Sequence, residues 1–256
     1  MSVLITNDDG IQAVGMHALA RALAGADIPV AVVAPEHERS ATGHAITLHK
    51  PLRAVRAAIP GLEVPAWATN GTPADCVVLG VLDLLPQRPE VVVSGINVGP
   101  NIGGDLTYSG TVSGAMEGAI MGIPAIALSV ASFEVPTFEV AATVAVRLVE
   151  VVRRSGLPPD TLLNVNVPNL SLAELGGIAV TRQGTRRYLN RLDKRKDPRG
   201  RTYYWMGGEE DPMPDEEGTD AWALRRGMIS VTPIQMNMTA VTILEEMAAR
   251  LAGIRL

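Results

Sequence analysis

Apolar residues in this chain form short continuous runs that alternate with longer stretches of helical spacing. Runs at residues 3–6, 30–34 and 91–94 are typical of buried strands, and residues 12–25 and 72–85 between them have helical periodicity. The pattern continues with a helix at 111–121, a strand at 124–129, a helix at 138–154 and a strand at 162–167. This order predicts an α/β fold with a Rossmann-like, doubly wound and mostly parallel sheet.

The pattern changes in the last third of the chain. Residues 182–201 hold nine Lys or Arg against two Asp, and an acidic stretch at 209–217 precedes a predicted strand at 228–232 and a helix at 240–251. The basic segment is interpreted either as a solvated hairpin or as an arm exchanged between subunits. We therefore predict an α/β domain at 1–180 and a C-terminal extension at 181–256 that completes the fold.

Composition narrows the class of protein. The 256 residues are 47% hydrophobic and 19% charged, which is enough for a large core, and the net charge of -5 argues against binding to a nucleic-acid polymer. No charged and apolar leader precedes the first strand, and no apolar run reaches bilayer length. We expect a cytoplasmic, soluble protein without a membrane partner, in which the single Cys76 has a packing role.

The first strand runs directly into two adjacent carboxylates, Asp8 and Asp9. Ligands of open α/β sheets bind at the carboxyl ends of the strands, and neighbouring acids that lose water there are stabilised by a cation. An Asx-type turn is the alternative, because Asp and Gly also supply turn geometry. Loops after two further strands add Ser40 and Asn97, and such oxygen ligands suit one hard divalent cation, Mg²⁺ or Mn²⁺, with Ca²⁺ also able to occupy the site.

A second candidate site follows the glycine-rich segment 95–105. Ser109, Gly110 and Thr111 open a helix there, and Asn101 lies in the loop before them. Free N–H groups, hydroxyl donors and the positive end of the helix dipole suit a phosphate group, although ordinary N-capping explains the same residues. Facing a metal site across the same sheet edge, the segment is better explained as a phosphate site.

These motifs, taken together and in this order, closely resemble the SurE (survival protein E) family. The resemblance runs from residue 3 to about residue 245 and rests on Asn7-Asp8-Asp9-Gly10, Arg39-Ser40, Gly71 to Val77, Ser94 to Asn97, Tyr108 to Val112, Thr219-Asp220 and Ile229 to Pro233. Ala41 follows the serine where other members have glycine, so the hydroxyl is retained while the conformation of the loop is put in doubt.

The resemblance implies a divalent-metal-dependent phosphatase, a 5′-nucleotidase that hydrolyses nucleoside 5′- and 3′-monophosphates and in some members short polyphosphate. It implies metal ligation by Asp8, Asp9, Ser40 and Asn97, and a homodimer or homotetramer built by the extension. We expect Asp8 or Asp9 to orient or deprotonate the attacking water, with a covalent aspartyl-phosphate as the competing route.

Two other classes of protein remain alternatives. A non-catalytic module that only binds nucleotide or phosphate needs no more than a cation and a helix N-terminus. A haloacid-dehalogenase-type phosphatase also begins from strand-end aspartates, but it separates the two acids by one residue, whereas Asp8 and Asp9 are adjacent. His44 has no visible partner and is interpreted as a loop polar group, and Glu117 as structural or solvated.

Overall fold

One mostly parallel sheet forms the centre of the protein. In the computed structural model, which describes residues 2–134, 136–185, 188–210 and 214–254, nine strands follow the order β3-β4-β2-β1-β5-β6-β7-β11-β8. Their bounds are β1 (Val3–Thr6), β2 (Val30–Pro35), β3 (Ala54–Arg56), β4 (Ala66–Thr69), β5 (Val91–Val98), β6 (Ala125–Ala131), β7 (Thr161–Pro168), β8 (Ile178–Val180) and β11 (Ile229–Gln235). The predicted α/β fold class is confirmed.

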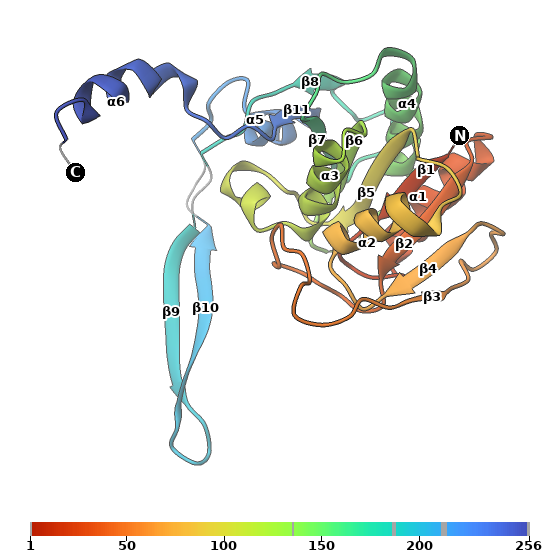
Figure 1. The fold of residues 1–256 in the computed structure, drawn as a ribbon, viewed down its shortest axis with the longest axis horizontal. Coiled ribbons are helices and arrows are strands. Elements are labelled where there is room, and N and C mark those ends of the chain that lie inside the picture. The colour runs from red at the N-terminus through yellow and green to blue at the C-terminus, as the bar shows by residue number, and fades with distance from the viewer. Residues whose placement is uncertain (1, 135, 186–187, 211–213, 255–256) are drawn as a thin grey trace.

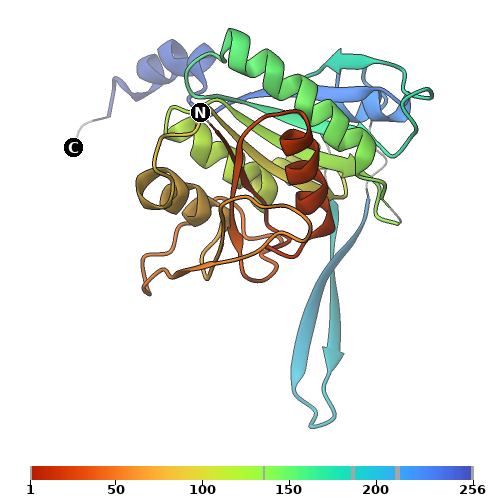
Figure 2. The same cartoon turned by 90° about the vertical axis from the view of Figure 1, so that its right-hand side faces the viewer.

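Helices cover both faces of this sheet (Figures 1 and 2). Helices α1 (Val14–Gly25) and α4 (Glu139–Ser155) pack on one core, and α2 (Pro73–Leu79) and α3 (Gly110–Ile120) pack on the other. The strands between them are buried on both faces, which explains their continuous apolar runs. Each predicted helix of this region is present within a few residues of its expected bounds.

Helix α2 begins and ends for local reasons. The Thr72 hydroxyl accepts from the N–H of Asp75, the Asp75 carboxylate accepts from the N–H of Thr72, and Pro73 occupies the first turn. Its α-helical part ends at Leu79 and continues as the π-helical turn Gly80–Leu84, so the single helix expected to Leu85 is two segments. Cys76 on this helix is fully buried, as its predicted packing role requires.

The glycines of α3 allow this helix to lie directly on the sheet. A Cβ atom at Gly114 would come within 2.7 Å of Ser94 Oγ, and one at Gly118 within 2.9 Å of Val92 Cβ. This close approach fixes the N-terminus of α3 at the carboxyl edge of the sheet.

The C-terminal region adds strands to the central sheet and also forms a hairpin and a helix outside it. Strand β11 lies antiparallel to β7 and parallel to β8, whereas β9 (Tyr188–Lys196) and β10 (Thr202–Glu210) form a separate antiparallel hairpin. Figure 1 shows this hairpin and α6 (Leu244–Leu251) projecting from the body. Residues 186–187 of the basic segment and 211–213 of the acidic segment lie outside the described residues. No helix in the described part of the chain is long and apolar enough to cross a membrane.

The chain changes direction across the sheet between β1 and β5. From β1 it moves through β2 to β4 on one side, and from β5 through β6 to β7 on the other. The loops after β1 and β5 therefore diverge at their carboxyl ends, where α/β proteins of this type bind ligands. Asp8 and Asp9 follow β1, and Asn97 lies near the end of β5.

Candidate active site

The turn that carries the acid pair is built by Asn7. Its Oδ1 accepts from the N–H of Gly10 at 3.2 Å, and its Nδ2 donates to the carbonyl oxygen of Gly10 at 3.0 Å. Asn7 is fully buried, so these two bonds close a tight turn at the end of β1. The turn geometry of the alternative interpretation is therefore present, and it presents Asp8 and Asp9 at the sheet edge.

The two carboxyl groups of this turn are both difficult to ionise. Asp8 is only 4% exposed, and burial raises its pKa although the hydrogen bond from Thr111 opposes the effect. Burial and then the neighbouring charge of Asp8 raise the pKa of Asp9 to about 7. A bound cation is the ordinary means of keeping two such adjacent groups charged.

The loop after β2 is attached to the acid turn through the backbone. The N–H of Arg39 donates to the carbonyl oxygen of Asp8 at 2.7 Å, which brings the next residue, Ser40, beside the acid pair. Ser40 is exposed, and its hydroxyl donates to Glu38 Oε1 at 2.6 Å. Glu38 also contributes to the raised pKa of both aspartates. The sequence did not single out this third carboxylate, because it lies in a loop with several polar residues.

Asn97 is positioned by an irregularity in the pairing of β5 with β6. The register shifts between Ser94 and Asn97, and such a bulge redirects a side chain near an active site. The Nδ2 of Asn97 donates to the carbonyl oxygens of Val98 at 3.1 Å and Gly99 at 2.9 Å. Among the described residues nothing donates to its Oδ1, which leaves this oxygen for a ligand.

The first turn of α3 lies against Asp8. Thr111 is fully buried, and its hydroxyl donates to Asp8 Oδ1. A Cβ atom at Gly110 would come within 2.6 Å of Asp8 Cβ, which shows how closely the helix approaches the acid. Ser109 caps the helix by accepting from the N–H of Val112 at 3.1 Å. The structure thus brings the expected acid pair and the expected phosphate-binding residues together, with the Thr111 hydroxyl already bound to Asp8.

Asn101 is anchored by polar side chains from the interior of the sheet. Its N–H donates to Asn166 Oδ1 at 2.8 Å, and its carbonyl oxygen accepts from Asn164 and Asn166 at 2.8 and 3.0 Å. Its Nδ2 donates to Ser129 Oγ at 2.9 Å. These three partners were not predicted from the sequence, although Asn164 and Asn166, as polar residues inside the apolar strand 162–167, were a usable signal for two of them.

Asp220 ties the glycine-rich loop to the C-terminal extension. Its fully buried carboxylate accepts from the N–H of Gly103 at 2.8 Å and from the N–H of Gly184 at 3.0 Å. Gln183 adds a bond from its Nε2 to the carbonyl oxygen of Gly103 at 2.7 Å. The loop between β5 and α3 is therefore held by residues more than 75 positions later in the chain.

Near the same helix the structure pairs two residues that the sequence left apart. Nε2 of His44 lies 2.9 Å from Oε2 of Glu117, whose side chain is 11% exposed. His44 therefore has a partner, contrary to the expectation from sequence, and Glu117 is structural rather than solvated. The pair links the loop after Ser40 to the middle of α3.

Comparison with known proteins agrees with this arrangement. A family model described as Survival protein SurE matches residues 3–190. The chain is 52% identical to a 5′-nucleotidase SurE of Heliobacterium modesticaldum, covering 99% of this chain and 93% of that protein, and 51% identical to a 5′-nucleotidase SurE of Moorella thermoacetica, covering 98% and 96%.

A solved structure has the same fold. The crystal structure of the SurE protein from Aquifex aeolicus superposes with a TM-score of 0.85 at 45% identity, covering 98% of this chain and 99% of that one. Matches of this extent include the sheet, the acid turn and the C-terminal extension together. The chain belongs to the SurE family.

Proposed function

We propose that this protein is a divalent-metal-dependent phosphomonoester hydrolase that releases inorganic phosphate from nucleoside 5′-monophosphates. The observation that carries the proposal is the contact between the acid pair and the N-terminus of α3, made by Thr111 and Asp8. A helix N-terminus attracts an anion, whereas adjacent carboxylates repel one. A cation bound between the phosphate and the two carboxylates removes this repulsion, so that the anion can bind at the helix N-terminus beside the acid pair. The relatives' name, 5′-nucleotidase, supports this substrate class.

The residues around the acid turn fit one hard divalent cation, Mg²⁺ or Mn²⁺. The proposed ligands are Asp8, Asp9, Ser40 and Asn97, and all four supply oxygen atoms of the kind such ions prefer. Within the described residues, no three His, Cys, Asp or Glu side chains form a group that could hold a metal ion. The proposed set needs only two carboxylates, with an amide and a hydroxyl. When bound, the cation would neutralise phosphate oxygens and increase the acidity of water.

The substrate's phosphate is proposed to bind at the start of α3. The N–H of Gly110 and the hydroxyl of Ser109 would donate to its oxygens, because the Ser109 oxygen is used only as an acceptor by the helix cap. Asn101 has a second N–H on Nδ2 beyond the one given to Ser129. The Thr111 hydroxyl has another role, because it donates to Asp8 and so favours the charged form of this carboxyl group against the effect of burial.

The proposed base is Asp9. Asp8 is buried, hydrogen bonded and crowded by Gly110, whereas the Asp9 carboxylate is partly exposed and has no hydrogen-bond donor among the described residues. It is therefore free to accept a proton from the attacking water. Attack by an aspartate on phosphorus is the competing route, and trapping of an acyl-phosphate with hydroxylamine would reveal it.

Phosphate release with and without a chelator tests the proposal. We expect 5′-nucleotides to be hydrolysed only with Mg²⁺ or Mn²⁺, and Asp9→Asn to lose at least about 100-fold in rate. Asp83→Asn, the same change at an exposed residue of η1 (Gly80–Leu84), is the matched control. Full activity in chelator would refute the metal assignment, and nucleotide binding without turnover would identify a non-catalytic module. Including 3′-nucleotides and short polyphosphate defines the substrate range.

The C-terminal extension, residues 181–256, is proposed to mediate self-association of the catalytic domain at 1–180 as a homodimer or homotetramer. Exposed apolar side chains on the hairpin, among them Trp205 and Met206, support this assignment, as does α6, which has no buried residue. A two-stranded hairpin is only marginally stable alone. Light scattering would report the mass, and a monomer would refute the proposal.

A further inference from the structure

A pocket lies beside the proposed active site, at the carboxyl ends of β6 and β7. Its volume is about 580 Å³, within the usual range for small-molecule sites. Its walls include Pro100 and Ile102 from the glycine-rich loop, Phe133 after β6, Pro168 and Leu170 after β7, and Leu224 from α5 (Asp220–Arg225). The mechanism proposed above uses none of these side chains.

Phe133 supplies an exposed aromatic surface next to the proposed metal ligands. Its side chain is 68% exposed. The ring packs directly on Gly99, because a Cβ atom there would come within 2.2 Å of Phe133 Cε1. Gly99 follows Asn97 by two residues, and its carbonyl oxygen accepts from the Asn97 amide at 2.9 Å. The loop that presents a proposed metal ligand therefore also supports an open aromatic ring.

The pocket is correctly placed for the part of a nucleotide that the phosphate site leaves free. In the sheet, β6 is separated from β1 by β5 alone. Two strand spacings amount to about 10 Å, so a phosphate at the end of β1 and a base at the end of β6 are joined by one ribose. On the opposite side, β2 ends in the polar loop 36–40, which contains His37 but no Phe, Tyr or Trp.

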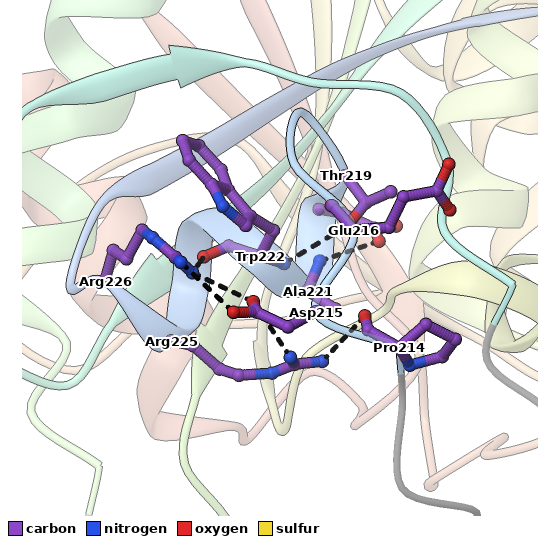
Figure 3. Close-up of polar contacts among 9 residues, drawn as sticks. Pro214, Asp215, Glu216, Thr219, Ala221, Trp222, Arg225 and Arg226 are labelled. Carbon is purple, nitrogen blue, oxygen red and sulfur yellow. Dashed lines mark hydrogen bonds and ion pairs between the residues drawn. The ribbon is translucent and has the colours of Figure 1, made fainter.

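The walls of the pocket are fixed before any ligand binds. Asn164 and Asn166 hold the loop at Asn101, between Pro100 and Ile102. On the other wall, the Asp215 carboxylate binds both Arg225 and Arg226, at 3.1 and 2.9 Å from Oδ1, as Figure 3 shows. Preformed walls reduce the entropy lost on binding.

We infer that this pocket binds the nucleoside of the substrate, with the base stacked on Phe133. The inference rests on the proposed function. Flat aromatic rings stack on nucleobases of any sequence, and the apolar side chains of the walls suit the faces of a purine or pyrimidine. Polar groups for the ribose and the edges of the base line the same pocket at Ser132, Asn169 and Arg225. The pocket therefore separates a nucleotide from a simple sugar phosphate, while the residues at Asp8 and α3 treat the phosphate of both alike.

The test compares adenosine 5′-monophosphate with ribose 5-phosphate, which has the phosphate and sugar but no base. Phe133→Ala is expected to raise KM for the nucleotide about tenfold and to leave kcat/KM for ribose 5-phosphate within about twofold of wild type. Phe133→Tyr should retain the preference for nucleotide. Leu82→Ala, at a 71% exposed residue of η1, is the control for loss of an exposed apolar side chain.

Equal changes for both substrates, or no change for either, would overturn the inference. If wild type releases phosphate from neither substrate, the proposed function fails, and the pocket is then tested by titration with adenosine alone, followed by NMR. Adenosine should bind wild type and bind Phe133→Ala about tenfold more weakly, and failure to bind wild type would overturn the inference. A changed mass of Phe133→Ala in light scattering with unchanged substrate preference would instead identify a contact between two copies, and would also overturn it.

Discussion

Gly110→Ala tests the contact between helix α3 and the acid turn. The added Cβ atom would lie 2.6 Å from Asp8 Cβ and 2.7 Å from Asp8 Oδ2, closer than packed carbon atoms approach one another. Asp8 cannot easily turn away, because the Thr111 hydroxyl holds its Oδ1. Either Asp8 or the first turn of α3 must therefore move.

The effect on stability is expected to be modest and the effect on catalysis large. Replacing glycine by alanine at an unstrained position stabilises a protein by about 0.4–1 kcal/mol, whereas overpacking costs about 1–3 kcal/mol. We expect a net loss of about 1–2 kcal/mol. Displacing a catalytic group by about 1 Å costs roughly 100-fold in rate. The fall in kcat/KM should therefore exceed what partial unfolding explains.

Two measurements on the same protein separate these effects. Urea unfolding gives the change in the free energy of unfolding. Phosphate release from a nucleotide gives kcat/KM, and it is measured without urea, where the variant is folded. Gly25→Ala is the matched control, because a Cβ atom there meets nothing within 4 Å. That variant should keep full activity and equal or slightly greater stability. Activity of Gly110→Ala within twofold of wild type would refute the assignment of Asp8 to the reaction.

Two further predictions concern stability. Asp220→Ala removes the acceptor of two buried N–H groups, those of Gly103 and Ala221, and of the part-buried N–H of Gly184, so we expect a loss of about 2–4 kcal/mol in urea unfolding. Asp220→Asn keeps one acceptor oxygen and should lose about half, and equal losses would contradict this account. Burial favours the neutral form of Asp75, but hydrogen bonds from Thr47 and Thr72 outweigh it and hold its pKa below the usual 3.8. This stabilisation is complete above the pKa that Asp75 has in the unfolded chain, and it is lost as the pH falls through its pKa in the folded protein. The loss of unfolding free energy caused by Asp75→Asn should therefore be largest near neutral pH and should shrink below about pH 4. A loss that does not depend on pH would contradict this account.

The sequence predicts the elements of this fold better than their partners. Continuous apolar runs identified β1, β2, β5 and β6, because strands buried on both faces need apolar residues at nearly every position. β7 was predicted although Asn164 and Asn166 interrupt its apolar run. The pairing of β4 with β2, and of β11 with both β7 and β8, was not predicted. Those pairs join segments far apart in the chain, and local periodicity contains no information on which edge a short strand will join.

For the candidate site, too, the sequence predicts the residues better than the partners that hold them. The acid pair and the start of α3 could be placed together because both lie at carboxyl ends of strands in a parallel sheet. The support for the loop could not be predicted: Asn101 depends on Asn166, 65 residues away, and Gly103 depends on Asp220, 117 residues away. Such bonds are visible in sequence only as polar residues within apolar surroundings, without any indication of their partners.

The late position of β11 has a consequence for synthesis of the protein. β11 ends at Gln235 but lies beside β7, which ends at Pro168. While the ribosome makes the intervening residues, the edge of β7 has open N–H and C=O groups, and such an edge is a template for pairing with another nascent chain. Only the arrival of β11 closes it. The exposure of this edge during translation therefore ends only with β11, long after the residues of the acid turn and of α3 have been made.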